Sequence, residues 1–316
     1  MTAWLLAFWL WQAGADELAE QGRERAAAGR MEEAAALWRK ALGVAPNHYA
    51  SLFNLGFMAW QQKRDAEAVG WFERAARAQP GDFNALYLAG SASSRQGKSA
   101  EAIAWWRRAL AVQPANAKLR LAMAAEYTRA KRFRDVVEVS EGALDSEAMF
   151  LMVIAARRAL GEMDQTAGLV NRALERFPNS ARVQFEAGYD LHRAGQWQRS
   201  TPYFERATAL DPAYEEPHYY RGDALFRQDR YGAAVESFLE AIRIRPDYTL
   251  ARVGLARAYL AMGKATQAAE TLEAATRLDP ENPQPYALLA QVYFRLGQSD
   301  KAQAAKVLAQ RLRAVR

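Results

Sequence analysis

The pattern that decides the fold is clearest in residues 49–80, YASLFNLGFMAWQQKRDAEAVGWFERAARAQP, a stretch that ends in Pro80. Prolines recur at a spacing of 34 residues in two series along the chain. They are Pro46, Pro80 and Pro114, then Pro178, Pro212, Pro246 and Pro280. A fixed period of about 20 to 50 residues is typical of a chain built from stacked copies of one small unit. The sequence therefore predicts a repeat protein, whose function must lie on the surface that the stack creates.

Each repeat is numbered here so that its proline falls at position 32. Repeats then begin at Ala15, Tyr49, Phe83, Glu147, Ala181, Glu215 and Thr249, with a last copy from Pro283 to Arg316. In the repeat at residue 49, apolar and small residues recur three and four positions apart, first over residues 52–59 and again over 68–76. This spacing predicts two helices per repeat, each with one buried face.

Several positions carry residues of a fixed size in successive repeats. Position 8 is mostly small and position 24 mostly bulky, as in the pairs Gly56 with Phe72 and Gly188 with Phe204. Position 20 is small, and position 27 is alanine throughout. Small residues that face a large one let paired helices approach closely and interlock. The pattern resembles the tetratricopeptide repeat (TPR) family, and the resemblance covers residues 15–316. It implies an all-α fold, a right-handed α-solenoid superhelix of about nine helical hairpins.

Glycine and proline mark the ends of the predicted helices. Glycines stand at position 15 of several repeats, where the first helix should end in a left-handed residue; among them are Gly97, Gly161, Gly195, Gly263 and Gly297. The proline closes the second helix because it cannot continue one. Candidate N-caps follow it, at Asn47, Asp82, Asn116, Ser180, Asp247 and Asn282.

Residues 117–146 form a shortened repeat without a proline. Ala124, Tyr127, Val136 and Ala143 still occupy positions 8, 11, 20 and 27, so the missing residues fall at its end. Loss of the usual turn predicts a changed angle between the neighbouring repeats. We therefore expect repeats 1–4 over residues 16–146, a joint at repeat 4, and repeats 5–9 with a terminal capping helix over residues 147–316.

Residues 1–15 read as a signal peptide. Trp4 to Trp11 is an unbroken apolar run, and Ala13-Gly14-Ala15 fits the small-x-small rule for cleavage, which would leave Asp16 first. The run is too short to span a bilayer, which takes about 20 apolar residues. Its start lacks the usual Lys or Arg, so an apolar extension packed on repeat 1, or a misassigned start codon, is the alternative. The sequence predicts a periplasmic or secreted protein, with a cytoplasmic location as the alternative and no stable membrane insertion after cleavage.

Composition excludes several kinds of site. The chain has no cysteine, so disulfides, thiol nucleophiles and acylation of an N-terminal cysteine are excluded. The net charge of +6 divides evenly between the two halves of the chain and forms no basic block, so no nucleic-acid partner is expected. His48, His192 and His218 fall in different repeats at unrelated positions, and no phosphate loop or hydrolase motif occurs. We expect no metal, no cofactor and no enzymatic activity.

First-helix positions 2, 5, 9, 12 and 13 are not needed for packing, and in the TPR family they line a concave groove that holds a peptide. On this basis the predicted peptide-binding residues are Phe53, Asn54, Phe57, Trp60, Asn84, Tyr87, Arg95, Arg129, Phe185, Tyr189, Arg193, Tyr219, Tyr220, Asp223, Phe226 and Arg227. The aromatic residues among them form two patches, one on each side of the shortened repeat. The Lys and Asn pair of the family's chaperone-tail clamps is absent.

Aromatic residues at helical spacing can serve the core instead of a partner site. We expect Phe53 and Phe185 to pack between adjacent first helices, and Phe57, Trp60, Tyr189, Tyr220 and Phe226 to be partly exposed. The arginines at position 13 would hold carboxylates or carbonyls of an extended peptide, although a solvated helix end also explains them. The sequence thus predicts a non-catalytic scaffold that binds a protein or peptide segment. The alternative is an accessory subunit of a cell-envelope assembly or secretion machine that uses its ends or its convex face.

Overall fold

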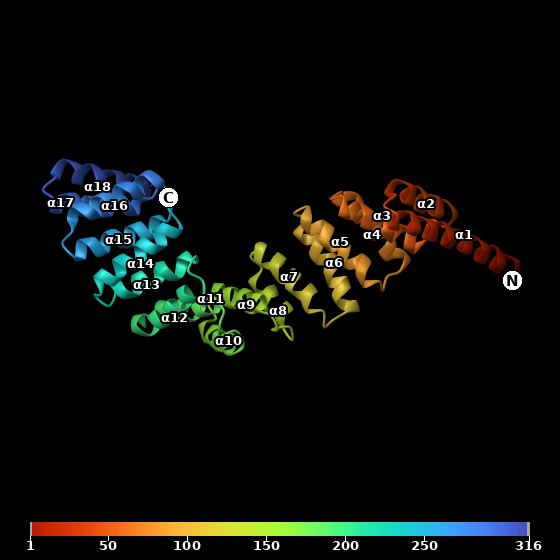
Figure 1. Ribbon diagram of the computed structural model, residues 1–316, viewed down its shortest axis with the longest axis horizontal. Helices are drawn as coiled ribbons and strands as arrows, with labels where there is room; N and C mark the ends of the chain where they lie inside the picture. Colours follow the sequence, from red (N-terminus) through yellow and green to blue (C-terminus); the bar gives the residue numbers. More distant parts are fainter. Residues whose placement is uncertain (1, 315–316) are drawn as a thin grey trace. The chain divides into compact units, whose positions relative to one another are not determined.

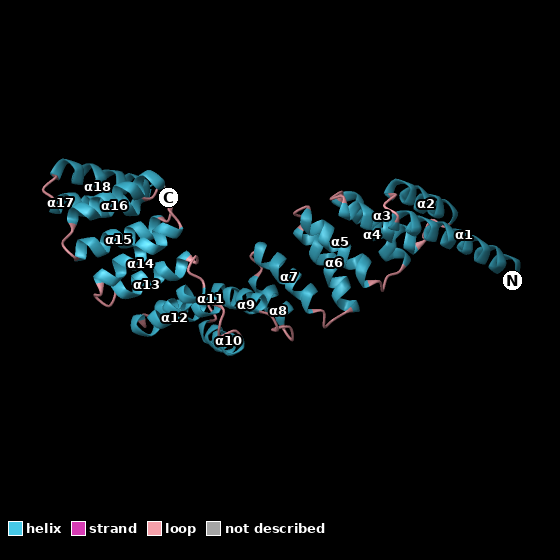
Figure 2. Cartoon of the chain, in the orientation of Figure 1, coloured by secondary structure: helices cyan, strands magenta, loops and turns pink. Residues whose placement is uncertain are grey.

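The computed structural model describes the backbone of residues 2–314 and the side chains of residues 13–314. Over these residues the chain consists of helices joined by short turns, without strands (Figure 2). The first helices of the repeats are α1 (Thr2–Ala27), α3 (Tyr49–Gln61), α5 (Phe83–Arg95), α7 (Ala117–Arg129), α9 (Glu147–Ala159), α11 (Ala181–Arg193), α13 (Glu215–Phe226), α15 (Thr249–Ala261) and α17 (Pro283–Arg295). The second helices are α2 (Met31–Val44), α4 (Asp65–Ala78), α6 (Ser99–Val112), α8 (Phe133–Ser140), α10 (Met163–Arg176), α12 (Trp197–Leu210), α14 (Tyr231–Ile244), α16 (Ala265–Leu278) and α18 (Ser299–Ala314).

The helix boundaries confirm the repeat frame. From α3 onward, every first helix begins at the residue where the proline spacing places the start of a repeat. The second helices before Pro80 and Pro212 end at Ala78 and Leu210, two residues before the proline. The all-α solenoid predicted from the sequence is therefore confirmed.

The chain forms two compact units, residues 1–161 and 162–316. The boundary falls in the turn between the two helices of repeat 5. The predicted division after residue 146 and the predicted joint in repeat 4 stay predictions.

Within each unit the first helices form a layer of their own. In unit 1, α1 contacts α3, α3 contacts α5, and α7 contacts α9; in unit 2, α11, α13, α15 and α17 contact one another in succession. Second helices inside a unit, such as α4 and α14, pack against the first helices on either side of them (Figure 1). Because neighbouring first helices are in direct contact, we assign them to the inner, concave layer and the second helices to the outer layer.

Position 8 meets position 24 in the core of the hairpins that have glycine at position 8. A Cβ atom added to Gly56 would lie 2.9 Å from the ring of Phe72, and one added to Gly188 would lie 2.7 Å from the ring of Phe204. Both phenylalanines are fully buried. The packing inferred from residue sizes is therefore present: glycine lets the two helices approach until the aromatic ring touches the opposing backbone.

Position 15 has a positive φ in every repeat. Six repeats place glycine there, and the other three place Lys63, Lys131 and Asp229, with φ of 58°, 55° and 59°. The glycine turns are confirmed, and the same turn forms at Lys63, Lys131 and Asp229, where the Cβ atom makes the left-handed conformation more costly than it is for glycine.

Side-chain caps begin several of the first helices. Asp82, Asn116, Ser180 and Asn282 accept hydrogen bonds from the first turn, as expected. The predictions of Asn47 and Asp247 as caps are wrong, since the residues that precede the helices are His48 and Tyr248. These helices begin one residue later than a cap at Asn47 or Asp247 requires, and His48 caps α3 through its own ring nitrogen.

Repeat 4 differs from its neighbours in its second helix. Helix α8 has 8 residues where α4, α6 and α10 have 14. The chain leaves it through Gly142, which has φ of 75°. A buried carboxylate, Glu126 on α7, links repeat 4 to repeat 3 by accepting hydrogen bonds from the hydroxyls of Ser94 and Ser99. Burial opposes its ionisation, but these bonds and Arg129 outweigh burial and lower the pKa of Glu126.

Candidate functional site

The first aromatic patch lies on α3 in unit 1. Four aromatic residues follow one another along the helix: Tyr49 stacks on Phe53 with ring centroids 5.8 Å apart, Phe53 on Phe57 at 6.3 Å, and Phe57 on Trp60 at 5.9 Å. Phe53 also contacts the buried ring of Phe72 and is half-buried, whereas Phe57 is 37% exposed. We call these four residues patch 1. It is anchored in the core at Phe53 and open to solvent at Phe57.

Arg95 of the next repeat covers the end of patch 1. Its guanidinium lies 4.6 Å from the ring centroid of Trp60, donates to the Trp60 carbonyl oxygen at 2.8 Å, and pairs with the carboxylate of Asp65. These contacts fix Arg95 and leave fewer of its donors for a ligand.

The other residues predicted on the inner layer of unit 1 differ in exposure. Tyr87 on α5 is half-buried, stacks on Phe83 at 5.7 Å, and its carbonyl accepts the indole N–H of Trp106. Asn54 is half-buried and Asn84 is exposed. Arg129 is exposed but pairs with Glu126.

The second aromatic patch joins α11, α12 and α13 in unit 2. Phe185 is buried and contacts Tyr189 at 5.7 Å and Tyr220 at 5.6 Å between ring centroids. Tyr189 and Tyr220 meet edge to face at 5.1 Å, and both are half-buried. Edge-to-face packing suits the ring quadrupoles and fixes the rings. We call Phe185, Tyr189, His192, Trp197 and Tyr220 patch 2.

His192 joins patch 2 to a charged residue of the next repeat. Its Nε2 lies 2.8 Å from Oδ2 of Asp223, and its ring lies 5.2 Å from that of Trp197. Burial opposes the ionisation of Asp223, but His192, Arg227 and Arg257 outweigh burial, so the pKa of Asp223 is lowered. His192 and Asp223 belong to successive repeats, and the hydrogen bond between them depends on the stacking of α11 against α13.

Three further predicted residues flank patch 2. Arg193 is exposed, with its guanidinium 5.9 Å from the ring centroid of Tyr189. Arg227 is exposed and lies 5.6 Å from the ring of Trp197 and 3.7 Å from Asp223. Phe226 is half-buried and contacts Tyr231 at 5.5 Å. The exposure expected for Phe57, Trp60, Tyr189, Tyr220 and Phe226 agrees with the structure.

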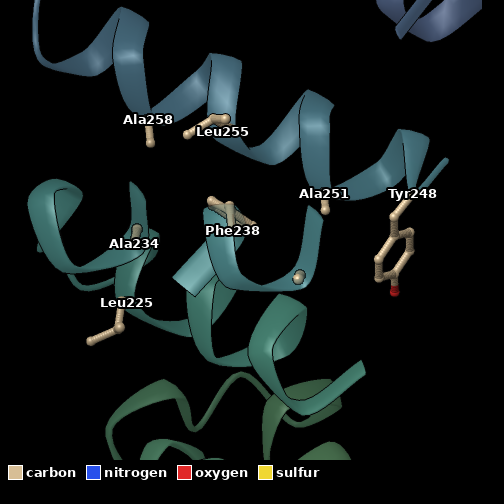
Figure 3. Packing of buried hydrophobic residues seen from close by; sticks show 8 residues of the cluster. Leu225, Ala234, Phe238, Tyr248, Ala251, Leu255 and Ala258 are labelled. Atoms are coloured by element: carbon tan, nitrogen blue, oxygen red, sulfur yellow. The ribbon is translucent and has the colours of Figure 1, made fainter. Parts of the chain in front are cut away.

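Tyr219 packs mainly against core residues and contributes little to the inner surface. Its ring contacts Phe238 at 5.9 Å and Tyr248 at 5.3 Å, and burial raises its pKa. Figure 3 shows the cluster that it joins, in which Phe238 of α14 points toward Leu255 of α15. The sequence carries a sign of this packing that the prediction did not use: position 34 is also aromatic in these two repeats. The ring centroid of Tyr214 lies 5.3 Å from that of Phe185, and the ring centroid of Tyr248 lies 5.3 Å from that of Tyr219.

A pocket of about 420 Å³ lies on the inner layer of unit 2, where α13, α15 and α17 meet. Its lining consists of Phe226, Arg227, Arg257, Leu260, Ala261, Leu288, Gln291 and Arg295. We call it the basic pocket, because three of these residues are arginines and none is acidic. Arg257 was not predicted as a binding residue, since only position 13 showed arginine in repeat after repeat.

A serine, a histidine and an aspartate meet near the start of unit 1. His48 Nδ1 lies 2.9 Å from the Ser51 hydroxyl oxygen, and its Nε2 lies 2.8 Å from Asp16 Oδ1. Ser51 is fully buried and His48 is 5% exposed, so no substrate reaches the hydroxyl. The array ties α1 to the start of α3. Among the described residues, no group of three or more His, Asp or Glu is placed to hold a metal ion.

These observations define a class: a helical-repeat solenoid whose inner helices carry aromatic and basic side chains. Sequence models of the tetratricopeptide repeat match residues 19–83, 72–117 and 185–249, and a second set matches residues 225–291 and 260–305. The chain belongs to the tetratricopeptide repeat family. Repeats of this family form protein-interaction scaffolds, which is the coarse class of function that the chain shares.

Two curated relatives come from Arabidopsis thaliana. The inactive TPR repeat-containing thioredoxin TTL3 is 33% identical over 100 residues, which are 32% of this chain and 14% of the relative. The TPR repeat-containing thioredoxin TTL4 is 34% identical over 110 residues, 33% of this chain and 16% of the relative. The match thus spans only about a seventh of each relative's length.

Solved structures of MamA show a similar course of the chain. One has a TM-score of 0.48 at 22% identity and covers 51% of this chain and 95% of its own. Another, of MamA from Desulfovibrio magneticus RS-1, has a TM-score of 0.49 at 18% identity, with 53% and 95% covered.

Proposed function

We propose that this chain is a non-catalytic scaffold that binds a protein or peptide segment along its first helices, at patch 1 and patch 2. The observation that carries the proposal is the arrangement of patch 1, where Phe57 is held between Phe53 and Trp60 yet is 37% exposed. A ring fixed by its neighbours loses little conformational entropy when a partner covers it. Rigid, partly exposed aromatic side chains are the usual anchors of protein interfaces.

Patch 2 supports the same function in unit 2. Tyr189 and Tyr220 have half-buried aromatic rings that lie on fixed neighbours, so each can serve as a preordered apolar contact. Full burial of one large apolar side chain is worth about 1.5 to 3 kcal/mol. Because the rings are already half-buried, each should contribute less than this range to binding.

A peptide-display library selected on the full chain tests the proposal. We expect Phe57→Ala and Tyr189→Ala each to weaken binding of the selected peptides about fivefold, which corresponds to roughly 1 kcal/mol. Leu239→Ala is the matched control, because Leu239 is 45% exposed on the second helix α14. Circular dichroism should show that all variants are folded. Selected peptides whose affinity is the same for both aromatic variants and for the parent chain would exclude these patches as the binding site.

The second candidate function is that of an accessory subunit in an envelope assembly. The observation that favours it is a hollow of about 880 Å³ lined by α17 and α18, beside which Phe294 is 75% exposed. A largely exposed phenylalanine at a hollow is a typical docking feature. In the same binding experiment, a partner that is lost with Phe294→Ala and kept with Phe57→Ala would assign the interaction to this surface.

Export is part of the proposal. The apolar run of residues 4–11 and the small residues before Asp16 support a cleaved leader and a periplasmic or secreted scaffold. Among the described helices, none combines the length and apolar character that crossing a bilayer requires.

A further inference from the structure

The basic pocket of unit 2 differs from both aromatic patches in its charge. Arginines from three successive repeats line it: Arg227 at the C-terminal cap of α13, Arg257 on α15 and Arg295 on α17. No carboxylate lines the pocket. Like charges held close together repel one another unless a counter-charge lies among them.

Asp223 supplies internal counter-charge to the pocket: it forms an ion pair with Arg227, and its charge also acts on Arg257. Asp223 lies 3.7 Å from Arg227 and also hydrogen-bonds to His192. Arg257 and Arg295 are both exposed, and neither forms an ion pair within the described part of the chain. By contrast, Arg95 and Arg129, which occupy position 13 in unit 1, pair with Asp65 and Glu126. Two guanidinium groups of the basic pocket therefore keep their donors available.

Apolar side chains complete the pocket. Phe226, Leu260 and Leu288 line it from the same three helices that supply the arginines. A volume of about 420 Å³ has room for a few side chains and not for a folded domain. Guanidinium groups around an apolar floor suit a chain that alternates carboxylates with apolar side chains.

We infer that the basic pocket binds an extended acidic peptide segment, with Arg257 and Arg295 holding its carboxylates and Phe226, Leu260 and Leu288 receiving an adjacent apolar side chain. This inference rests on the proposed function, because it names the chemistry of the bound segment in unit 2. The pocket adjoins patch 2 through Arg227, whose guanidinium lies over Trp197. A segment bound here can continue onto Tyr189 and Tyr220. One peptide would then contact the basic pocket with its acidic residues and patch 2 with its apolar residues, in a single chain direction.

The test uses the full chain and a fluorescein-labelled peptide of alternating glutamate and leucine. Its matched probe is the same peptide with glutamine in place of glutamate, and a single-stranded oligothymidine provides a phosphate backbone for comparison. Fluorescence anisotropy should show tight binding of the acidic peptide alone, and the affinity should fall as salt is added. Arg257→Gln and Arg295→Gln should each raise its Kd roughly tenfold, as expected for the loss of one charge-assisted contact.

Arg277→Gln is the control variant. Arg277 is exposed on the second helix α16, and its replacement removes the same charge from the outer layer. Binding that weakens equally in this variant would reduce the effect to net charge and overturn the inference. Equal affinity for the glutamine peptide would also overturn it, and so would tighter binding of the oligothymidine through the same arginines.

The two proposals fail in different ways. Peptides whose affinity does not depend on Phe57 or Tyr189 contradict the aromatic scaffold. Peptides that bind through those rings, yet show no preference for acidic residues and no dependence on Arg257 or Arg295, contradict the basic pocket alone.

Discussion

At the scale of single residues, the tightest constraint in the chain is the contact between positions 8 and 24. Gly56 and Phe72 show it in repeat 2, and Gly188 and Phe204 in repeat 6. The added Cβ would touch a ring that is itself fully buried, so neither partner has room to move. The same two positions gave the clearest size pattern in the sequence, because packing inside one hairpin repeats with the period.

Replacement of Gly56 by alanine should therefore destabilise the fold. The new methyl group would lie 2.9 Å from Phe72, and relief of this overlap should cost about 1 to 3 kcal/mol. Gly70→Ala is the matched control in the same repeat, since nothing lies within 4 Å of its added Cβ and it sits in the exposed part of α4. Alanine there should stabilise by about 0.5 to 1 kcal/mol. Urea unfolding followed by circular dichroism measures both, and equal midpoints would contradict the packing argument.

The ion pairs of the arginines were less predictable from the sequence than the packing of the core residues. Position 13 is arginine in several repeats, yet Arg95 is held by Asp65 and Arg129 by Glu126, while Arg295 has no ion pair in the described chain. The counter-charge comes from another turn or another repeat, at a position that the period leaves free. No pattern within one repeat distinguishes an arginine that pairs with a carboxylate of the chain from one that does not.

At the scale of helices, repeat 4 is the exception to a regular design. Its second helix α8 has 8 residues against 14 in α4, and residues 141–146 that follow are not helical. A shorter helix has fewer internal hydrogen bonds and a larger share of frayed ends. Repeat 4 should therefore open locally more readily than its neighbours in unit 1.

Hydrogen exchange followed by mass spectrometry tests this expectation. Amides of residues 133–146 should exchange at least about tenfold faster than those of α4 and α6. The control is α7, the first helix of the same repeat, which should stay protected because Glu126 ties it to Ser94 and Ser99. Protection in α8 equal to that in α4 would show that the shortened repeat is not a weak point.

At the scale of the whole molecule, the proposed export depends on cleavage of the chain after Ala15. Helix α1 runs from residue 2 to residue 27 and passes through Ala13-Gly14-Ala15 without a break. Ala15 is fully buried and Asp16 binds His48. A peptidase needs an extended, accessible substrate, so cleavage after Ala15 must come before this part of the chain folds.

Expression of the full chain in a bacterium with a functional export pathway tests this. We expect the mature protein in the periplasmic or secreted fraction, with Asp16 as its first residue by N-terminal sequencing. Ala15→Trp should block cleavage, because the small-residue rule is then broken. A cytoplasmic protein that keeps Met1 would exclude export.

The sequence by itself determined the hairpin, its period, its core and the helix each residue lies on, because these depend on distances inside one repeat and every repeat restates them. Even so, the caps predicted at Asn47 and Asp247 are misplaced by one residue, because in these two repeats the Asn or Asp stands at position 33 and the capping position is 34. Only the tertiary structure decided which inner residues are free. It buried Tyr219 against Tyr248, paired His192 with Asp223, and gathered Arg257 and Arg295 into one pocket. His192 and Asp223 belong to different repeats, as do Arg257 and Arg295, and the period sets the spacing of such residues without setting their partners.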